Sequence, residues 1–270
     1  MTDAATPPPA EKPVRRSQRS RPWRTWALAA VATVAVLVGA ALAWGLLPLG
    51  PSPQALRALE STSWVNVAET SYGWRFQPQN TTPETGLVIY PGGHVDPRSY
   101  APLARDLAAR GHVVAVLKVP LSLAVLAPRA ADAPLHQERS VATWVLAGHS
   151  LGGVMAARYA RSYPDSISGL LLLASYPDAA ADLSTSTIPA TSIVGTADGV
   201  LNTTAWDAAR PRLPRDTKIV EIPGGNHSQF GSYGLQGGDN VATISADLQE
   251  RAIADAAQEL FVRAAAYRVP

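Results

Sequence analysis

The stretch AGHSLGG around Ser150 constrains the fold most, because it sets a single serine between glycines directly after an apolar run. Gly148 and Gly152 flank this serine at the spacing Gly-x-Ser-x-Gly. The apolar run at 143–147 predicts a strand, and the apolar periodicity of 150–163 predicts a helix. A strand that turns abruptly into a helix needs small neighbours, and the bend lifts the serine side chain away from the backbone. The stretch therefore predicts an exposed, nucleophilic serine.

The body of the chain alternates short apolar runs with helical stretches, which favours an α/β fold. An antiparallel pair of strands is expected first, followed by further strands at regular intervals: 64–70, 74–76, 87–90, 113–119, 143–147, 170–174, 191–194 and 218–222. Helices are expected from Asp96 to Gly111, at 150–163, and at 240–267 with Asp239 as the N-cap. This alternation predicts a mainly parallel central sheet covered by helices on both faces.

A serine hydroxyl needs a base to remove its proton before it attacks. The only histidine after Ser150 is His227, which lies in a glycine-rich loop behind the last expected strand. Where such a serine turn is catalytic, the nucleophile, the acid and the histidine follow in this order along the chain. Asp198 lies between them in a turn of small residues and would fix the imidazole tautomer. Asp178, after the preceding strand, is the second candidate for this acid.

The oxyanion that develops during attack on a carbonyl needs two fixed hydrogen-bond donors. The backbone N–H of Leu151, directly after the serine, is expected to be one of them. The second is expected from the glycine-rich turn that follows the strand at 87–90. The backbone of His94 is the first choice for this donor, and that of Gly93 the alternative.

Four motifs together carry a resemblance to a known family: YPGGHVDPRSYAPLARDLAARG, AGHSLGG, GTADGVL and PGGNHSQFGSYG. With them the chain resembles the α/β-hydrolase fold superfamily from about Thr70 to its C-terminus, and more narrowly a compact, dienelactone-hydrolase-like branch. The resemblance implies a serine hydrolase that works through an acyl-enzyme, with Ser150, Asp198 and His227 as its triad and with no cofactor and no metal. Dienelactone hydrolases use a cysteine nucleophile, and this chain has no cysteine, so their substrate is not carried over.

The expected site is open, because only about fourteen residues separate Ala174 from Ile188, where many lipases insert a cap. We therefore expect no large cap domain and a small or exposed ester substrate, with a lactone or a thioester as variants. Two other functions stay open from the sequence. One is an acyltransferase or amidase that acts on cell-envelope components, and the other is a catalytically silent hydrolase-fold module that only binds.

Residues 26–47 contain no charged side chain and predict a transmembrane helix. Twenty-two helical residues rise about 33 Å, which spans a hydrocarbon core of about 30 Å. Arginines precede the segment, so the tail at 1–25 is expected in the cytoplasm, disordered, and the rest of the chain outside. A linker at 48–61 and a hydrolase domain at 62–270 would follow. A cleaved signal peptide, which would make the protein secreted, is the alternative.

The charge distribution argues against nucleic acid as a partner. Residues 1–25 contain six of the 23 Lys and Arg and two of the 21 Asp and Glu, so 17 basic and 19 acidic residues remain for the rest. The basic isoelectric point therefore comes from the tail, whereas the body is slightly acidic. Nucleic-acid-binding domains instead carry a basic patch on the folded body.

Overall fold

A computed structural model of the protein describes residues 22–267. The chain divides into two units, with the boundary between Ala41 and Leu42. Helix α1 extends from Pro22 to Leu46. Among the described residues, no helix combines the length and the apolar character of a membrane span, so the transmembrane helix predicted at 26–47 has no support from the structure. The predicted tail at 1–25 lies almost entirely outside the described residues.

The described residues form one eight-stranded sheet in the order β1-β2-β4-β3-β5-β6-β7-β8. Strands β1 and β2 are antiparallel, β2 is antiparallel to β4, and all other neighbours are parallel. The strands are β1 (Val65–Thr70), β2 (Gly73–Pro78), β3 (Thr85–Tyr90), β4 (Val113–Leu117), β5 (Thr143–His149), β6 (Gly169–Leu173), β7 (Ala190–Gly195) and β8 (Thr217–Ile222). The predicted antiparallel pair and the predicted mainly parallel sheet are both confirmed.

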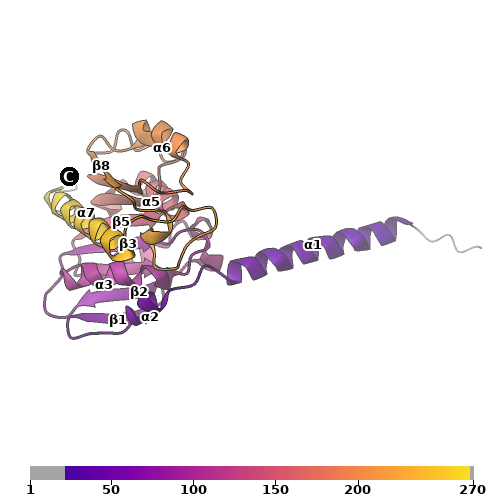
Figure 1. The fold of residues 1–270 in the computed structure, drawn as a ribbon, viewed down its shortest axis with the longest axis horizontal. Coiled ribbons are helices and arrows are strands. Elements are labelled where there is room, and N and C mark those ends of the chain that lie inside the picture. Colours follow the sequence, from indigo (N-terminus) through magenta and orange to yellow (C-terminus); the bar gives the residue numbers. More distant parts are fainter. Residues whose placement is uncertain (1–21, 268–270) are drawn as a thin grey trace, which may run out of the picture. The chain divides into compact units, whose positions relative to one another are not determined.

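Helices cover both faces of this sheet (Figure 1). Helices α3 (Ala101–Ala109) and α7 (Ala246–Ala266) pack on one face, and α5 (Leu151–Ser162) packs on the other. The shorter helices α2 (Pro53–Arg57), α4 (Asp132–Gln137) and α6 (Thr203–Ala209) lie in the connections. Side chains alternate along each central strand, so that Leu87 and Ile89 of β3 join the core under α3 and α7. Val88 and Tyr90 point the other way and join the core under α5. This two-sided burial explains why the strands are almost continuously apolar.

The last helix begins later than the sequence predicts. Helix α7 starts at Ala246, and Ser245 is its N-cap, with a side chain that accepts the N–H of Leu248. The predicted N-cap, Asp239, is therefore wrong. The residues before the helix are drawn into tertiary contacts instead, since Thr243 donates its N–H to the carbonyl of Gly224 at 2.8 Å. These tertiary contacts outweigh the helical propensity of the residues before Ala246.

Candidate active site

Ser150 lies in a strained turn between β5 and α5. Its φ of 50° and ψ of −120° fall in a region that L residues rarely adopt. The flanking glycines make this turn possible because no side chain fits beside it. A Cβ atom on Gly148 would collide with the backbone of Gly152, and one on Gly152 would collide with the carbonyl groups of Tyr90 and Pro91. The sequence-based reason for small residues at these two positions agrees with the packing.

Hydrogen bonds to the backbone of Ser150 hold the turn in place. Its N–H donates to the carbonyl of Leu173 at the end of β6, at 2.9 Å. Its carbonyl accepts the N–H of Gly153 at 2.9 Å and the hydroxyl of Ser175 at 2.7 Å. Ser175 is buried directly behind the turn. These partners offset part of the cost of the strained backbone, which is about 1–3 kcal/mol for a residue of this kind.

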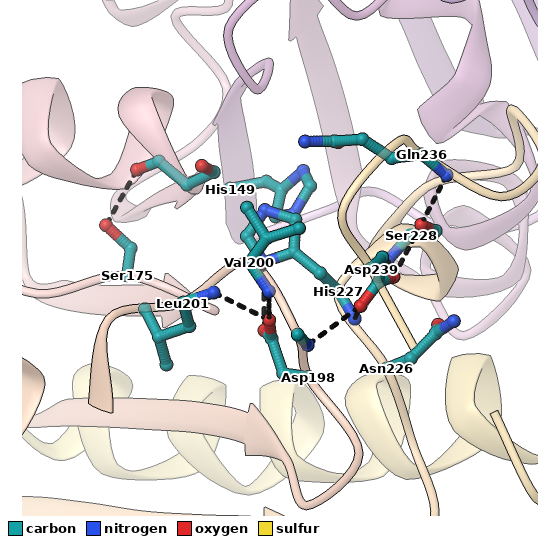
Figure 2. A network of polar contacts seen from close by, with 12 residues as sticks. His149, Ser175, Asp198, Val200, Leu201, Asn226, His227, Ser228, Gln236 and Asp239 are labelled. Atoms are coloured by element: carbon teal, nitrogen blue, oxygen red, sulfur yellow. Dashed lines mark hydrogen bonds and ion pairs between the residues drawn. The ribbon is translucent and has the colours of Figure 1, made fainter. Parts of the chain in front are cut away.

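Asp198 and His227 lie together at the carboxyl ends of β7 and β8. The Oδ2 atom of Asp198 and the Nδ1 atom of His227 are 2.8 Å apart, and both side chains are 2 % exposed. The other carboxylate oxygen accepts the N–H groups of Val200 and Leu201 at 2.8 and 2.7 Å. Figure 2 shows these two N–H groups directed at Asp198. The carboxylate is therefore fixed by its own turn and can orient the imidazole.

This arrangement leaves the Nε2 atom of His227 for proton transfer, because Nδ1 is engaged with Asp198. In the described part of the chain, no hydrogen bond joins the Ser150 hydroxyl to His227. Catalytic hydrogen bonds of this kind are often long without substrate and shorten only when it binds.

Asp178, the second candidate for the acid, is engaged elsewhere. Its carboxylate forms an ion pair with Arg158 on α5, in which the guanidinium Nε lies 3.0 Å from Oδ2. The Arg158 hydrogen bonds, opposed by partial burial, keep the pKa of Asp178 below its ordinary value. The structure thus brings Asp198, and not Asp178, to the histidine.

A further carboxylate, that of Asp239, connects the turn of Asp198 after β7 to the turn of His227 after β8. The sequence analysis missed this role. Its Oδ1 accepts the N–H of Gly199 at 2.9 Å and that of His227 at 3.3 Å. Its Oδ2 accepts both the N–H and the hydroxyl of Ser228, at 2.8 and 2.6 Å. Burial raises the pKa of Asp239, but these hydrogen bonds outweigh burial and lower it overall. Figure 2 shows Asp239 between the two turns.

The expected oxyanion donor at His94 is wrong. Its N–H already donates to the carbonyl of Ser122 at 2.8 Å. Gly93, the alternative, lies beside the residue after the nucleophile, because an added Cβ there would be 3.1 Å from Cδ2 of Leu151. Within the described residues, the N–H groups of Gly93 and Leu151 have no hydrogen-bond acceptor of their own. The sequence could not show this, because Ser122 belongs to a distant loop.

A buried tyrosine and a buried histidine connect the turn after β3, which contains Gly92 and Gly93, to the turn of Ser150. The Tyr100 hydroxyl accepts the N–H of Gly92 and lies 2.8 Å from Nδ1 of His149. Burial raises the pKa of Tyr100, while burial and the neighbouring His227 lower the pKa of His149. Both groups are therefore favoured in their neutral forms, and they share one hydrogen bond between the Tyr100 hydroxyl and Nδ1 of His149. The ring centroid of His149 is 4.6 Å from that of His227.

Among residues 22–267, no group of three or more His, Cys, Asp or Glu side chains is arranged to hold a metal ion. The chemical groups of the site are a hydroxyl, an imidazole hydrogen-bonded to a carboxylate, and two backbone N–H groups that have no acceptor among the described residues. That set is suited to acyl transfer, in which a serine attacks a carbonyl carbon and the oxyanion is stabilised by backbone donors.

Comparisons with known proteins agree with this arrangement. Residues 86–251 match the profile of the alpha/beta hydrolase family. Among solved structures, a hyperthermophilic esterase from Pyrobaculum calidifontis is 16% identical, with a TM-score of 0.55 and coverage of 87% of this chain and 94% of that one. A dienelactone hydrolase from Anabaena variabilis is 15% identical, with a TM-score of 0.55 and coverage of 73% and 98%. No curated protein sequence matches the chain.

Proposed function

The chain belongs to the α/β-hydrolase family, and from this premise we propose that it is a serine hydrolase that cleaves carboxylic esters through an acyl-enzyme. The observation that carries the proposal is the buried Asp198–His227 pair beside the strained turn of Ser150. A structural role needs neither feature, because a buried imidazole–carboxylate pair and a strained serine both cost folding free energy.

In the first half of the reaction, the Oγ atom of Ser150 attacks the acyl carbon while Nε2 of His227 takes the hydroxyl proton. Asp198 stabilises the imidazolium that forms, and the N–H groups of Leu151 and Gly93 bind the negative oxygen. The bond to the alkoxy oxygen then breaks, and His227 gives its proton to the leaving alcohol. The acyl group remains on Ser150 as an ester.

In the second half, His227 removes a proton from a water molecule as the water oxygen attacks the acyl carbon. The same two N–H groups bind the second oxyanion. The Ser150 oxygen then leaves with the proton from His227, and the carboxylic acid is released. A lactone would follow the same course and open to a hydroxy acid, and a thioester would release a thiol.

An open site supports a small or exposed acyl group as the substrate. Between the end of β6 at Leu173 and the start of β7 at Ala190, the chain forms neither helix nor strand. Cap domains that enclose long acyl chains need more chain than this segment offers. Esterases among the structural neighbours agree with this substrate class. The chain length that the site prefers can be measured with a graded series of p-nitrophenyl esters.

The test is labelling by a fluorophosphonate probe, which reacts preferentially with an activated serine. We expect the wild-type protein to be labelled and Ser150→Ala to be unlabelled and inactive on p-nitrophenyl esters. Ser162→Ala, at the exposed end of α5, is the control and should be labelled like the wild type. Labelling of Ser150→Ala at the wild-type rate would refute the proposal.

We also propose an extracytoplasmic location for the hydrolase domain, with residues 26–47 as a membrane anchor. The support is the sequence alone: an uncharged apolar segment that follows a cluster of arginines. Fractionation of expressing cells tests this part separately. Membrane-bound protein that external protease can digest is expected, whereas full-length protein in the soluble cytoplasmic fraction would contradict the anchor. Release of a shortened chain into the medium would indicate signal cleavage instead.

A further inference from the structure

Residues 48–52, here called the strap, lie against two of the loops that form the candidate site. The sequence predicts only a linker for this segment. In the structure it forms backbone hydrogen bonds with the oxyanion turn, 91–96, and with the histidine loop, 227–234. Linkers seldom bond to a site in this way, since connecting segments usually run freely over the surface.

At the oxyanion turn, the strap pairs like a short parallel strand. The N–H of Leu49 donates to the carbonyl of His94 at 2.8 Å, and the carbonyl of Leu49 accepts the N–H of Asp96 at 3.0 Å. Leu49 and Val95 are the partners of this bridge. The side chain of Leu49 is half-buried and packs against the core cluster that contains Val95.

At the histidine loop, the strap is held by both the backbone and the side chain of one serine. The N–H of Ser52 donates to the carbonyl of Ser232 at 2.7 Å, and the two hydroxyl oxygens are 2.6 Å apart. Ser232 lies five positions after His227. Its own N–H donates to the carbonyl of Ser99 at 2.7 Å, so this part of the loop is tied on two sides.

The pairing at Leu49 reaches the proposed oxyanion donor through one peptide plane. The N–H of Gly93 belongs to the same planar unit as the carbonyl of Gly92. That carbonyl accepts the N–H of Val95 at 3.2 Å, and Val95 stands between the two residues that Leu49 binds. Fixing Val95 therefore fixes the direction in which the Gly93 N–H points.

We propose that the backbone hydrogen bonds of the strap position the oxyanion donor of Gly93 relative to His227. This inference rests on the proposed hydrolase function. Because the negative oxygen exists only in the transition state and the intermediates, a misdirected donor lowers kcat and leaves KM nearly unchanged. The affinity for a boronic acid, which forms a tetrahedral adduct with the serine, should fall together with kcat.

Two substitutions at one position separate hydrogen bonding from packing in the full-length chain. Leu49→Pro removes the N–H that binds His94, whereas Leu49→Ala keeps both backbone bonds and removes only packing. We expect Leu49→Pro to lower kcat and boronic acid affinity by about tenfold or more with KM within about twofold. Leu49→Ala should lower Tm and keep kcat within about twofold of wild type.

A folded Leu49→Pro protein with the kcat and boronic acid affinity of Leu49→Ala would overturn the proposal. Since the wild type and Leu49→Ala would both be active in that outcome, the hydrolase proposal would survive it. An inactive wild type, by contrast, would count against the hydrolase proposal itself.

Hydrogen exchange in the wild-type protein gives an answer even if Leu49→Pro does not fold. Coupling between two sites is reciprocal, so occupation of the oxyanion hole must stabilise the strap if the strap stabilises the hole. We expect the amides of Leu49 and Asp96 to exchange more slowly by about threefold or more after a phosphonate is attached to Ser150, from a modest coupling free energy. Equal exchange rates before and after labelling would overturn the proposal.

Discussion

The two halves of the candidate site are held by different kinds of contact. In the nucleophile half, the loops after β3 and β5, the turn of Ser150 depends on glycines packed against backbone and on backbone hydrogen bonds. In the acid–histidine half, the loops after β7 and β8, two buried or half-buried carboxylates accept hydrogen bonds from several N–H and O–H groups. Asp198 binds His227 and its own turn, and Asp239 joins the two turns.

This difference predicts different responses to substitution. At a glycine that packs against backbone, any side chain collides with atoms that cannot move aside, so no substitution preserves part of the contact. A carboxylate that accepts several hydrogen bonds can be replaced by an amide of nearly the same shape, which keeps some of the bonds and reverses others. Substitution of a glycine in the nucleophile half should therefore lower both kcat and stability. Substitutions in the acid–histidine half should distinguish a carboxylate that acts in catalysis from one that positions the histidine.

Asp198→Asn should have the largest effect in the acid–histidine half. An amide at this position no longer stabilises the imidazolium and favours the wrong tautomer of His227, so we expect kcat to fall by about 10³–10⁴-fold with little change in fold. Asp178→Asn is the matched control and should keep kcat within about threefold, since it removes only a partly exposed ion pair with Arg158. The reverse order of the two effects, measured on a p-nitrophenyl ester, would show that the acid is misassigned.

Gly152→Ala should disable the nucleophile half through packing. The added methyl group collides with the carbonyl groups of Tyr90 and Pro91 and pushes the turn of Ser150 away from its place. A misplacement of about 1 Å costs about 10²-fold in kcat, and overpacking costs about 1–3 kcal/mol of stability. Alanine at Gly39 of α1, where an added Cβ meets nothing within 4 Å, is the control. An active, fully stable Gly152→Ala protein would show that the packing argument is wrong.

Asp239→Asn should affect the same half as Asp198→Asn, but more weakly. The amide nitrogen cannot accept the N–H and hydroxyl of Ser228, so the histidine turn loosens while the Asp198–His227 contact persists. We expect a fall in kcat of about 10-fold to 100-fold, together with a lower Tm. Asp207→Asn, an exposed position on α6, serves as the control. If kcat stays at the wild-type value while Tm falls, Asp239 supports the fold and not the catalytic geometry.

Glu250 on α7 should change stability with pH and leave the rate unchanged. Burial, with the carboxylates of Asp106 and Asp247, raises the pKa of Glu250 from 4.5 to about 7. The native state therefore keeps a proton that the unfolded state releases, and stability falls as the pH rises from about 4.5 to about 7. Glu250→Gln should be more stable than wild type by about 2 kcal/mol at pH 8 after allowance for partial exposure, and equal to it near pH 4.

Thermal unfolding of wild type and Glu250→Gln across this pH range measures that difference. A constant difference in stability at all pH values would contradict the raised pKa of Glu250. The ester-cleaving rate at pH 7 should stay within about twofold of wild type, which separates this carboxyl from those that touch His227.

The sequence predicts the nucleophile half more fully than the other half because its determinants are local. The glycines around Ser150 and the apolar strand before it are adjacent in the chain, and the continuous apolar run of β3 follows from burial on both faces. Chain order points to His227, and a small-residue turn places Asp198 ahead of Asp178 as its acid, but only the structure separates these two carboxylates. The catalytic roles themselves stay predictions until the labelling experiment is done.

What the sequence could not predict depends on contacts between distant segments. The N–H of His94 is not available to an oxyanion because it donates to the carbonyl of Ser122. Asp239 does not cap the last helix and instead accepts hydrogen bonds from the turns after β7 and β8. Leu49 belongs to a proline-rich segment that reads as a linker, and its partner His94 lies on another loop. No periodicity or local spacing encodes such partners, because each is set only when the strands are in register.

The most direct test of the account is a crystal structure of the protein after reaction with a small alkyl fluorophosphonate. We predict a covalent bond from Oγ of Ser150 to phosphorus, with the phosphoryl oxygen within hydrogen-bond distance of the N–H groups of Leu151 and Gly93. Nε2 of His227 should face the serine oxygen, with its contact to Asp198 intact. Phosphorus on another side chain, or a phosphoryl oxygen directed away from both N–H groups, would contradict the account.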